Sequence, residues 1–451
     1  MNDTYRKVHR LTPLLKFWSV LVALAALFFL NFNASMIASI YAIAAGDPLL
    51  VAGLTVLGFA VLCGLIWLVS GIWWRKLGFH LGQEELSLRQ GVISTNLRTA
   101  RYDRTQAVDV VEPFVPRLFG LAAVRVETAG GESSVIELAY LKKNEAQELR
   151  LEVLARVKGA DAEELESEKD QGELLAHVPV GRAIGGVTLR LSTIWGALAV
   201  VALLFAPVPM ATVVPVLIGL LPSLWRLLDT AWEFNAELET DSQTGERTLE
   251  IGYGLTNRRS QSIRLSRIHG VQIRQPLLWR IFGWYEVSVT VAGYGQSTGG
   301  ASGSTRILPV GLREQAMELF ELVSPLTREE IQRCAQPEGH SAPDYTSPKS
   351  ARWVSPIDRK NQAVTMLKHV VVCHAGRIER RMAAIDMQHI QELTYKAGPL
   401  SQLAKVATVN FELVPGPVRM KGADLTPDDA EELLNRLRRR ALPDLDGTVE
   451  A

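Results

Sequence analysis

Two long stretches near the N-terminus contain no Asp, Glu, Lys, Arg or His, and they constrain the fold of this chain more than any other feature. They run from Phe17 to Phe32 and from Leu49 to Trp74. A helix of about 20 apolar residues spans the hydrocarbon core of a bilayer. We therefore predict a first pair of transmembrane helices within residues 14–75.

A second apolar block covers residues 191–228 and contains one charged side chain, Arg226. Pro207 and Pro209 divide it into two halves, which suggests two helices joined by a Pro-Val-Pro turn. Each half has only about 16–18 residues, so a full span, a thinned crossing and a re-entrant hairpin all fit. A buried helical hairpin of a soluble domain is disfavoured, because so large an apolar surface needs an apolar environment.

Lysine and arginine concentrate on one side of the predicted spans, and this asymmetry predicts the orientation of the chain. The connection at residues 33–48 and the turn between Pro207 and Pro209 contain no basic residue. Basic flanks stay in the cytoplasm. We therefore expect a multi-pass protein of the cell membrane whose termini and large hydrophilic segments are all cytoplasmic. The flanking basic residues are Arg6, Lys7, Arg10, Lys16, Arg75, Lys76, Arg182, Arg190 and Arg226.

The remaining composition excludes several classes of protein. The 48 basic and 48 acidic side chains balance, so a polycation that binds nucleic acid is not expected. The three cysteines, Cys63, Cys334 and Cys373, are too few and too far apart for a disulfide framework or a metal motif. The mean hydropathy of +0.10 reflects the concentrated apolar blocks.

An internal repeat organises the hydrophilic part of the chain. Gly91, Gly254 and Gly376 are each followed, fifteen residues later, by a polar residue in a similar apolar context. These three segments align without gaps over this distance, which indicates three copies of one unit. The polar residues are Gln106, His269 and Gln391.

An apolar skeleton continues the repeat beyond the first half. The segments 117–128, 280–291 and 402–413 share an alternating pattern that predicts a half-buried strand. The third copy is the most divergent, because Lys405 stands where the other two have glycine. We expect the valines of this strand to lie in equivalent cores; they are Val124, Val287 and Val409.

Each copy ends with a helical signal. The last is the clearest, with Thr426 as N-cap, Pro427 in the first turn and a leucine stripe that needs a partner surface. Several antiparallel strands closed by a C-terminal helix form an α+β unit with a bent sheet or partly open barrel. The predicted segments are the helix pair 14–75, unit one 78–158, an acidic linker 159–190, the helix pair 191–228, unit two 232–325, a Pro/Ser-rich linker 326–364 and unit three 365–441.

This combination of helix pairs and repeated strand-rich units resembles the bacterial pleckstrin-homology-like (PH-like) membrane proteins of the YdbT-like family. The motifs that carry the resemblance are RTQAVDV and RLFGLAAVRVET in the first unit, repeated in related form in the second. The resemblance implies a PH-like fold in each unit and a multi-domain membrane protein with α-helical hairpins. It supplies no catalytic residues. Members commonly have a helix pair before each unit, and residues 326–364 depart from that arrangement. Their Pro/Ser-rich composition instead predicts a linker that tethers the third unit without seating it in the membrane.

Known catalytic, cofactor and metal motifs are not found in the sequence, so we expect no enzymatic activity, no cofactor and no metal. His369, Cys373 and His374 form the one His/Cys cluster, but strand alternation would separate neighbouring side chains. We interpret His269 as a structural polar residue of the repeat. The glycine-rich segment from Gly295 to Ser304 lacks the lysine of a phosphate loop and suggests a hairpin tip.

Basic side chains in the first two units are the candidate membrane-surface contacts. Each arginine near an anionic bilayer contributes about 1 kcal/mol to binding, although the same residues also fit ordinary solvated strand positions. Strand alternation allows only some of them to share a face. The candidates are Arg89, Arg98, Arg101, Arg104, Arg258 and Arg259.

The sequence as a whole favours a non-enzymatic membrane scaffold whose PH-like units bind lipid headgroups or a membrane protein partner. Tethering to the bilayer raises the effective concentration of a weak site. The alternative is a transporter, or an accessory subunit of a transporter or channel, built on the four apolar helices. That alternative is weakened by the first helix pair, whose two apolar stretches contain no Asp, Glu, Lys or His.

The predicted topology can be tested by labelling single introduced cysteines with a membrane-impermeant reagent in intact cells. A cysteine next to Asp47 should react from outside, because residues 33–48 are predicted to be external. Cysteines in place of Glu132 and Glu246 should react only after the cells are opened. External labelling at either glutamate position would overturn the orientation.

Overall fold

The computed structural model divides into two units. It describes residues 5–16, 67–91, 94–128, 135–158, 173–206, 210–240, 245–292 and 305–440. The first unit contains residues 1–129 and 133–165, and the second contains residues 130–132 and 166–451. The first predicted helix pair lies outside the described residues, except for its two ends, Thr12–Lys16 and 67–76, which are helical.

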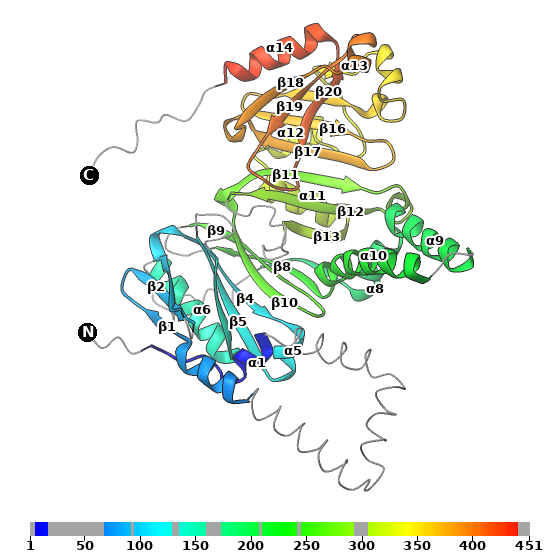
Figure 1. The fold of residues 1–451 in the computed structure, drawn as a ribbon. Coiled ribbons are helices and arrows are strands. Elements are labelled where there is room, and N and C mark those ends of the chain that lie inside the picture. The colour runs from blue at the N-terminus through cyan, green and yellow to red at the C-terminus, as the bar shows by residue number, and fades with distance from the viewer. Residues whose placement is uncertain are drawn as a thin grey trace. The chain divides into compact units, whose positions relative to one another are not determined.

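The first unit is one copy of the repeat. Strands β1, β2 and β3 form an antiparallel sheet, and β4, β5 and β6 form a second antiparallel ladder. Helix α6 closes the core between them, where Leu149 and Val153 pack with Leu86 and Val124 (Figure 1). Its elements are α1 (Thr12–Lys16), β1 (Gly78–Leu81), β2 (Glu85–Gln90), β3 (Asn96–Arg101), η1 (Tyr102–Arg104), β4 (Thr105–Glu112), α5 (Phe114–Leu118), β5 (Leu121–Thr128), β6 (Ile136–Lys142) and α6 (Lys143–Lys158).

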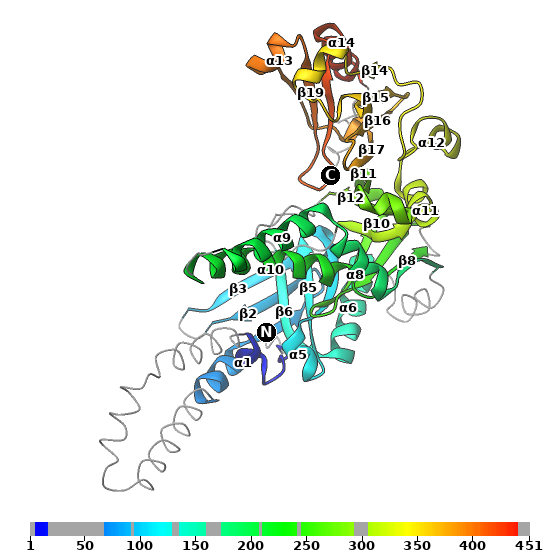
Figure 2. The same ribbon diagram turned by 90° about the vertical axis from the view of Figure 1, so that its right-hand side faces the viewer.

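The second unit begins with the next copy and the second helix pair. Helices α9 and α10 run side by side and project from this copy, as Figure 2 shows. Strands β7 to β10 pair in order, and β11, β12 and β13 form the second ladder. The elements are β7 (Glu173–Val178), α8 (Val180–Thr188), α9 (Leu191–Phe205), α10 (Met210–Ala231), β8 (Phe234–Thr240), β9 (Arg247–Tyr253), β10 (Arg258–Arg264), η3 (Leu265–Arg267), β11 (Ile268–Gln275), η4 (Leu278–Phe282), β12 (Trp284–Val291), β13 (Arg306–Leu312) and α11 (Arg313–Val323).

The third copy completes the second unit. Helix α14 covers its core, with Leu433 and Leu437 fully buried beside Val409 and Phe411. Its elements are α12 (Arg328–Cys334), β14 (Tyr345–Thr346), η5 (Lys349–Trp353), η6 (Arg359–Asn361), β15 (Ala363–Met366), β16 (Val370–Ala375), β17 (Arg380–Asp386), η7 (Met387–His389), β18 (Glu392–Lys396), α13 (Pro399–Leu403), β19 (Ala407–Glu412), β20 (Met420–Leu425) and α14 (Pro427–Arg438).

The backbone confirms the threefold repeat. Gly91, Gly254 and Gly376 all have positive φ values, of 115°, 122° and 79°. Each occupies the turn before the third strand of its copy, where a Cβ atom would lie 2.0 or 2.1 Å from a backbone carbonyl oxygen. Val124, Val287 and Val409 are fully buried in the predicted strand.

Lys405 also belongs to the repeat, although its residue type differs. It has a φ of 51°, and the glycines at the matching positions, Gly120 and Gly283, have φ values of 67° and 63°. The left-handed conformation is therefore kept in the third copy even though a side chain must be accommodated there.

A continuous sheet joins the second and third copies. Strand β11 pairs antiparallel with β17, so the sheet runs in the order β13-β12-β11-β17-β16-β15-β14. Ile273 lies opposite Met382 at the centre of this join. No local sequence pattern predicts this pairing, because the two strands are separated by more than a hundred residues.

The two segments predicted as linkers contain more structure than their composition suggested. The acidic segment contributes β7 and α8, and residues 159–172 lie outside the described part. The Pro/Ser-rich segment forms α12 and β14, and it buries Leu326, Ile331 and Tyr345. Tyr345 lies in the core of the third copy with Val364 and Leu433, so the segment is not an extended tether.

The second predicted helix pair is helical on both sides of residues 207–209, which lie outside the described part. Within the described residues, no single helix has the length and hydropathy needed to cross a bilayer. One bent pair, Val180–Thr188 with Leu191–Leu203 at 65°, meets those criteria together.

The turn glycines provide a test of the repeat. Replacing Gly91, Gly254 or Gly376 with alanine should destabilise the protein by about 1–3 kcal/mol, because the new Cβ atom meets a carbonyl oxygen at positive φ. The matched control is Gly252→Ala in β9, where a Cβ atom would have no neighbour within 4 Å. Thermal unfolding of the purified protein in detergent measures the difference. Glycine variants as stable as Gly252→Ala would contradict the equivalence.

Candidate functional site

Each copy exposes large apolar side chains on the short helix that precedes its central strand. We call these the apolar tips. Equivalent residues of the three copies, Leu118, Ile281 and Leu403, are 70%, 76% and 82% exposed. Monomeric proteins rarely expose such residues in groups without an interaction partner. The complete tips are Phe114, Leu118 and Phe119 at α5, Leu277, Ile281 and Phe282 at η4, and Leu400 and Leu403 at α13.

In the first unit, the apolar tip lies next to the segment that leads into the first predicted span. Val115 of α5 packs with Leu11 and Leu15 around a small cluster that contains Leu121. Leu15 belongs to α1, which ends at Lys16, directly before the apolar stretch that starts at Phe17. The tip and the predicted entry into the bilayer are therefore held together.

In the second unit, η4 lies against the helix that leads into the second apolar block. The indole Nε1 of Trp279 donates a hydrogen bond of 3.1 Å to the carbonyl oxygen of Gly186 in α8. Trp279 is fully buried, while Phe282 of the same short helix stacks on Trp284 with ring centroids 4.8 Å apart. The third copy repeats this arrangement in reduced form, since Ala351 of η5 packs against Ala404 beside α13.

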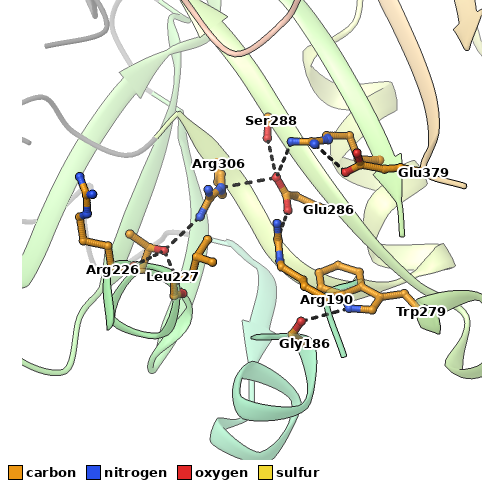
Figure 3. A network of polar contacts seen from close by, with 11 residues as sticks. Gly186, Arg190, Arg226, Leu227, Trp279, Glu286, Ser288, Arg306 and Glu379 are labelled. Carbon is orange, nitrogen blue, oxygen red and sulfur yellow. Dashed lines mark hydrogen bonds and ion pairs between the residues drawn. The ribbon is translucent and has the colours of Figure 1, made fainter. Parts of the chain in front are cut away.

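A buried carboxylate, Glu286 on β12, joins the second helix pair to the sheet (Figure 3). Arg190 is the residue before α9, and it forms an ion pair with Glu286 while its guanidinium lies 5.1 Å from the ring of Trp279. Arg306 of β13 lies 3.4 Å and Arg274 of β11 lies 3.9 Å from the other carboxylate oxygen. Glu286 thus lies among three arginines from three elements.

The same arginines extend the network to α10 and to the third copy. Arg306 donates to Thr230 Oγ1 at the end of α10, over 3.2 Å. Arg274 donates to Glu379 Oε1, over 2.5 Å, in the turn between β16 and β17. Through these contacts one carboxylate, Glu286, connects both ends of the helix pair with the neighbouring repeat.

The electrostatics of Glu286 show that the network holds it in its charged form. Burial alone would raise the pKa of this carboxyl group, but the charges of Arg190, Arg306 and Arg274 outweigh burial and lower the pKa to about 2. The group therefore stays ionised at neutral pH even though it is fully buried.

A basic pocket lies beside the turn between β16 and β17. It is a cavity of about 220 Å³ lined by Lys360, Arg380, Arg381, His340, His374 and one carboxylate, Glu338, which is paired with Arg313. A cavity of this size and charge suits a phosphate-containing group. Sequence reasoning missed the three cations, because Lys360 comes from the presumed linker and Arg380 and Arg381 come from an ordinary strand.

Positive charge is concentrated around this pocket. Burial lowers the pKa of Arg280, and the neighbouring charges of Arg380 and Arg377 lower it further. Arg280 also donates to the backbone carbonyls of Arg377 and Ile378, which brings it close to the same turn. Burial lowers the pKa of His374 to about 4, so this histidine is neutral at physiological pH.

The predicted membrane-surface arginines of β2 and β3 do not all lie on one face of their sheet. In the sheet of the first unit, Arg89 lies opposite Leu97 and Arg101 lies opposite Glu85, and the pairing places both arginines on the outer face. Arg98 is opposite the buried Leu88, on the other face. Arg101 also forms a salt bridge with Asp103.

The other predicted arginines lie outside this sheet. Arg104 is exposed in η1 of the first unit. In the second unit, Arg258 is exposed at the start of β10 and Arg259 is half-buried.

Of the histidine and cysteine residues singled out from the sequence, His269, Cys373 and His374 are packed in the fold, and His369 is exposed. Cys373 is buried, and burial raises the pKa of its thiol. His269 stacks on His389 with ring centroids 4.1 Å apart, at the join between the second and third copies. In the part of the chain that the structure describes, no group of three or more His, Cys, Asp or Glu side chains could hold a metal ion. The glycine-rich segment from Gly295 to Ser304 lies outside that part.

Comparison with known proteins agrees with the repeat. The family described as bacterial PH domain matches three segments of the chain, residues 20–157, 184–327 and 351–441. The UPF0699 transmembrane protein YdbT of Bacillus subtilis (strain 168) is 23% identical over 295 residues. The alignment covers 58% of this chain and 59% of YdbT, so the matched part is about three-fifths of that relative.

Glu286 provides a second test. The variant Glu286→Gln leaves three arginines around an uncharged amide, and it should destabilise the protein by about 3–5 kcal/mol. The matched control, Glu321→Gln, removes an exposed salt bridge with Arg328 and should cost at most about 1 kcal/mol.

The pH dependence of this difference has a defined sign. Because the folded-state pKa of Glu286 is lowered from 4.5 to about 2, its stabilising contribution is present above pH 4.5 and is lost as the pH falls towards 2. The gap in unfolding temperature between wild type and Glu286→Gln should therefore shrink over that window. A constant gap from pH 6 to pH 2 would contradict the assignment.

Proposed function

Since the chain belongs to the bacterial PH domain family, we propose that it is a non-enzymatic, multi-pass membrane scaffold that presents PH-like domains at the cytoplasmic face of the cell membrane. The relative YdbT is named a transmembrane protein, and this supports a membrane location. In this proposal, the two apolar helix pairs attach the protein to the membrane, and the three copies of the repeat provide the binding surfaces.

The observation that carries this proposal is the repetition of the apolar tips. Their exposed side chains occur at equivalent positions in all three copies, and in the first two copies they lie next to the segment leading into an apolar block. Apolar side chains at the interface of a bilayer bury about 5–10 Å deep among headgroups and acyl chains. The tips therefore fit a role as membrane anchors: they would insert into the bilayer interface and hold each copy of the repeat against the membrane.

The third copy has no apolar helix pair directly before it, yet its surface has the same character. Leu400 and Leu403 are exposed on α13, and the exposed Trp353 lies at the end of η5, which packs beside α13. Lys405 and Arg352 supply basic charge next to these apolar groups, which favours an anionic surface. In the scaffold, this copy would attach by surface contact alone.

The basic pocket supports a preference for anionic headgroups. Lys360, Arg380 and Arg381 surround a cavity large enough for one phosphate group, and the nearby cluster of arginines is under mutual repulsion. An anion in this place would relieve that repulsion. Arg280 of η4 donates to the turn that lines this pocket, so the headgroup would bind next to the apolar tip of the second copy.

The insertion of the apolar tips can be tested by measuring how deeply labelled tip residues enter the bilayer of liposomes. An environment-sensitive fluorophore attached to a cysteine in place of Leu118, Ile281 or Leu403 should shift to the blue and be quenched by brominated lipids, because these positions would enter the interface. The matched controls are cysteines in place of Glu148, Glu318 and Glu431, on exposed faces of the closing helices α6, α11 and α14. Equal responses at tips and controls, or none at the tips, would reject the membrane-seated scaffold.

A further inference from the structure

The join between the second and third copies provides a template for contacts between molecules. Strand β11 of the second copy and β17 of the third pair over six residues, from Gly270 opposite Ile385 to Gln275 opposite Arg380. In the repeat, β18 of the third copy is the counterpart of β11, and β3 of the first copy is the counterpart of β17. Each copy therefore has one strand equivalent to β11 and one strand equivalent to β17.

Among the described strands, β3 and β18 are each at the edge of a three-stranded sheet. Strand β3 ends the sheet β1-β2-β3, and β18 begins the sheet β18-β19-β20. An unpaired edge presents backbone N–H and C=O groups that another strand can bind. These two strands belong to the first and the last copy along the sequence.

The side chains at the two edges match those of the internal join. Ile273 and Met382 face each other there, and they are 1% and 0% exposed. Their counterparts in the repeat are Tyr395 on β18 and Leu97 on β3, which are 40% and 56% exposed. The positions that form the buried centre of the internal join are thus apolar and uncovered at the two ends.

The charges also favour pairing of β3 with β18. In the register of the internal join, Tyr395 would lie opposite Leu97 and Thr394 opposite Arg98. Glu392 would lie diagonally from Arg98, within reach of an ion pair. Pairing of two β3 strands would instead bring the arginines of both strands together, which is unfavourable.

We propose that β18 of one molecule pairs antiparallel with β3 of a second copy of this chain, in the register of β11 and β17. The contact is heterologous, since the two surfaces differ, so repetition gives a ring where the rotation closes and a filament where it does not. Confinement of both molecules to one membrane would raise their effective concentration and promote the contact. The sheet would then continue from molecule to molecule.

Disulfide cross-linking between separately produced variants tests the pairing. Leu97→Cys and Tyr395→Cys, mixed in detergent and oxidised, should give a product of twice the chain mass. The matched control is Arg98→Cys mixed with Tyr395→Cys, because neighbouring residues on a strand point to opposite faces. The native cysteines are present in every sample, so any background from them appears in the control. Absence of the product, or equal yields in both mixtures, would overturn the proposal.

A charge-swap series tests the same contact without a covalent bond. Leu97→Glu and Tyr395→Lys should each weaken self-association by at least about tenfold, measured from mass against concentration in detergent. The chain with both substitutions should regain association, because the new charges attract each other across the contact. A wild-type protein that stays monomeric at every concentration would exclude the second copy as the partner. In a chain with both cysteines, a cross-linked species of single-chain mass at high dilution would show that the edges close within one molecule instead.

Discussion

The ion pairs around Glu286 are the interaction on which the arrangement of the second unit depends. A fully buried carboxylate is unstable unless positive charge compensates for its lost hydration, and here three arginines do so. Arg190 precedes α9, and Arg306 hydrogen-bonds to the end of α10. Because Glu286 needs the positive charge of both arginines, it fixes the helix pair on the sheet. Arg274 extends the same constraint to Glu379 and thereby to the third copy.

The threefold repeat explains much of the remaining architecture, and the sequence revealed it because its markers are local. A turn glycine at positive φ and a buried valine at a fixed spacing are demanded by backbone sterics and core packing within one copy. The family resemblance and the α+β units could therefore be predicted, including the divergent third copy. Lys405 shows the limit of such markers, since it keeps the left-handed conformation without being glycine.

The features that carry the proposed function were harder to predict, because they depend on contacts far apart in the sequence. The partners of Glu286 come from residues 190, 274 and 306, and no local pattern connects them. The apolar tips resemble core residues in sequence, and only their exposure in the fold distinguishes them. The pocket beside Arg380 and Arg381 draws residues from a segment whose proline and serine content suggested a tether. The continuous sheet of β11 and β17 likewise arises from the stacking of copies.

Hydrogen–deuterium exchange of the intact protein in detergent tests most directly whether Glu286 links the helix pair to both repeats. Wild type, Glu286→Gln and Glu321→Gln would be compared peptide by peptide. The account predicts that Glu286→Gln accelerates exchange both at residues 191–196 of α9 and at residues 376–386, which include β17, while Glu321→Gln changes neither. Acceleration confined to β12 would show that Glu286 stabilises only its own strand, and it would contradict the central claim.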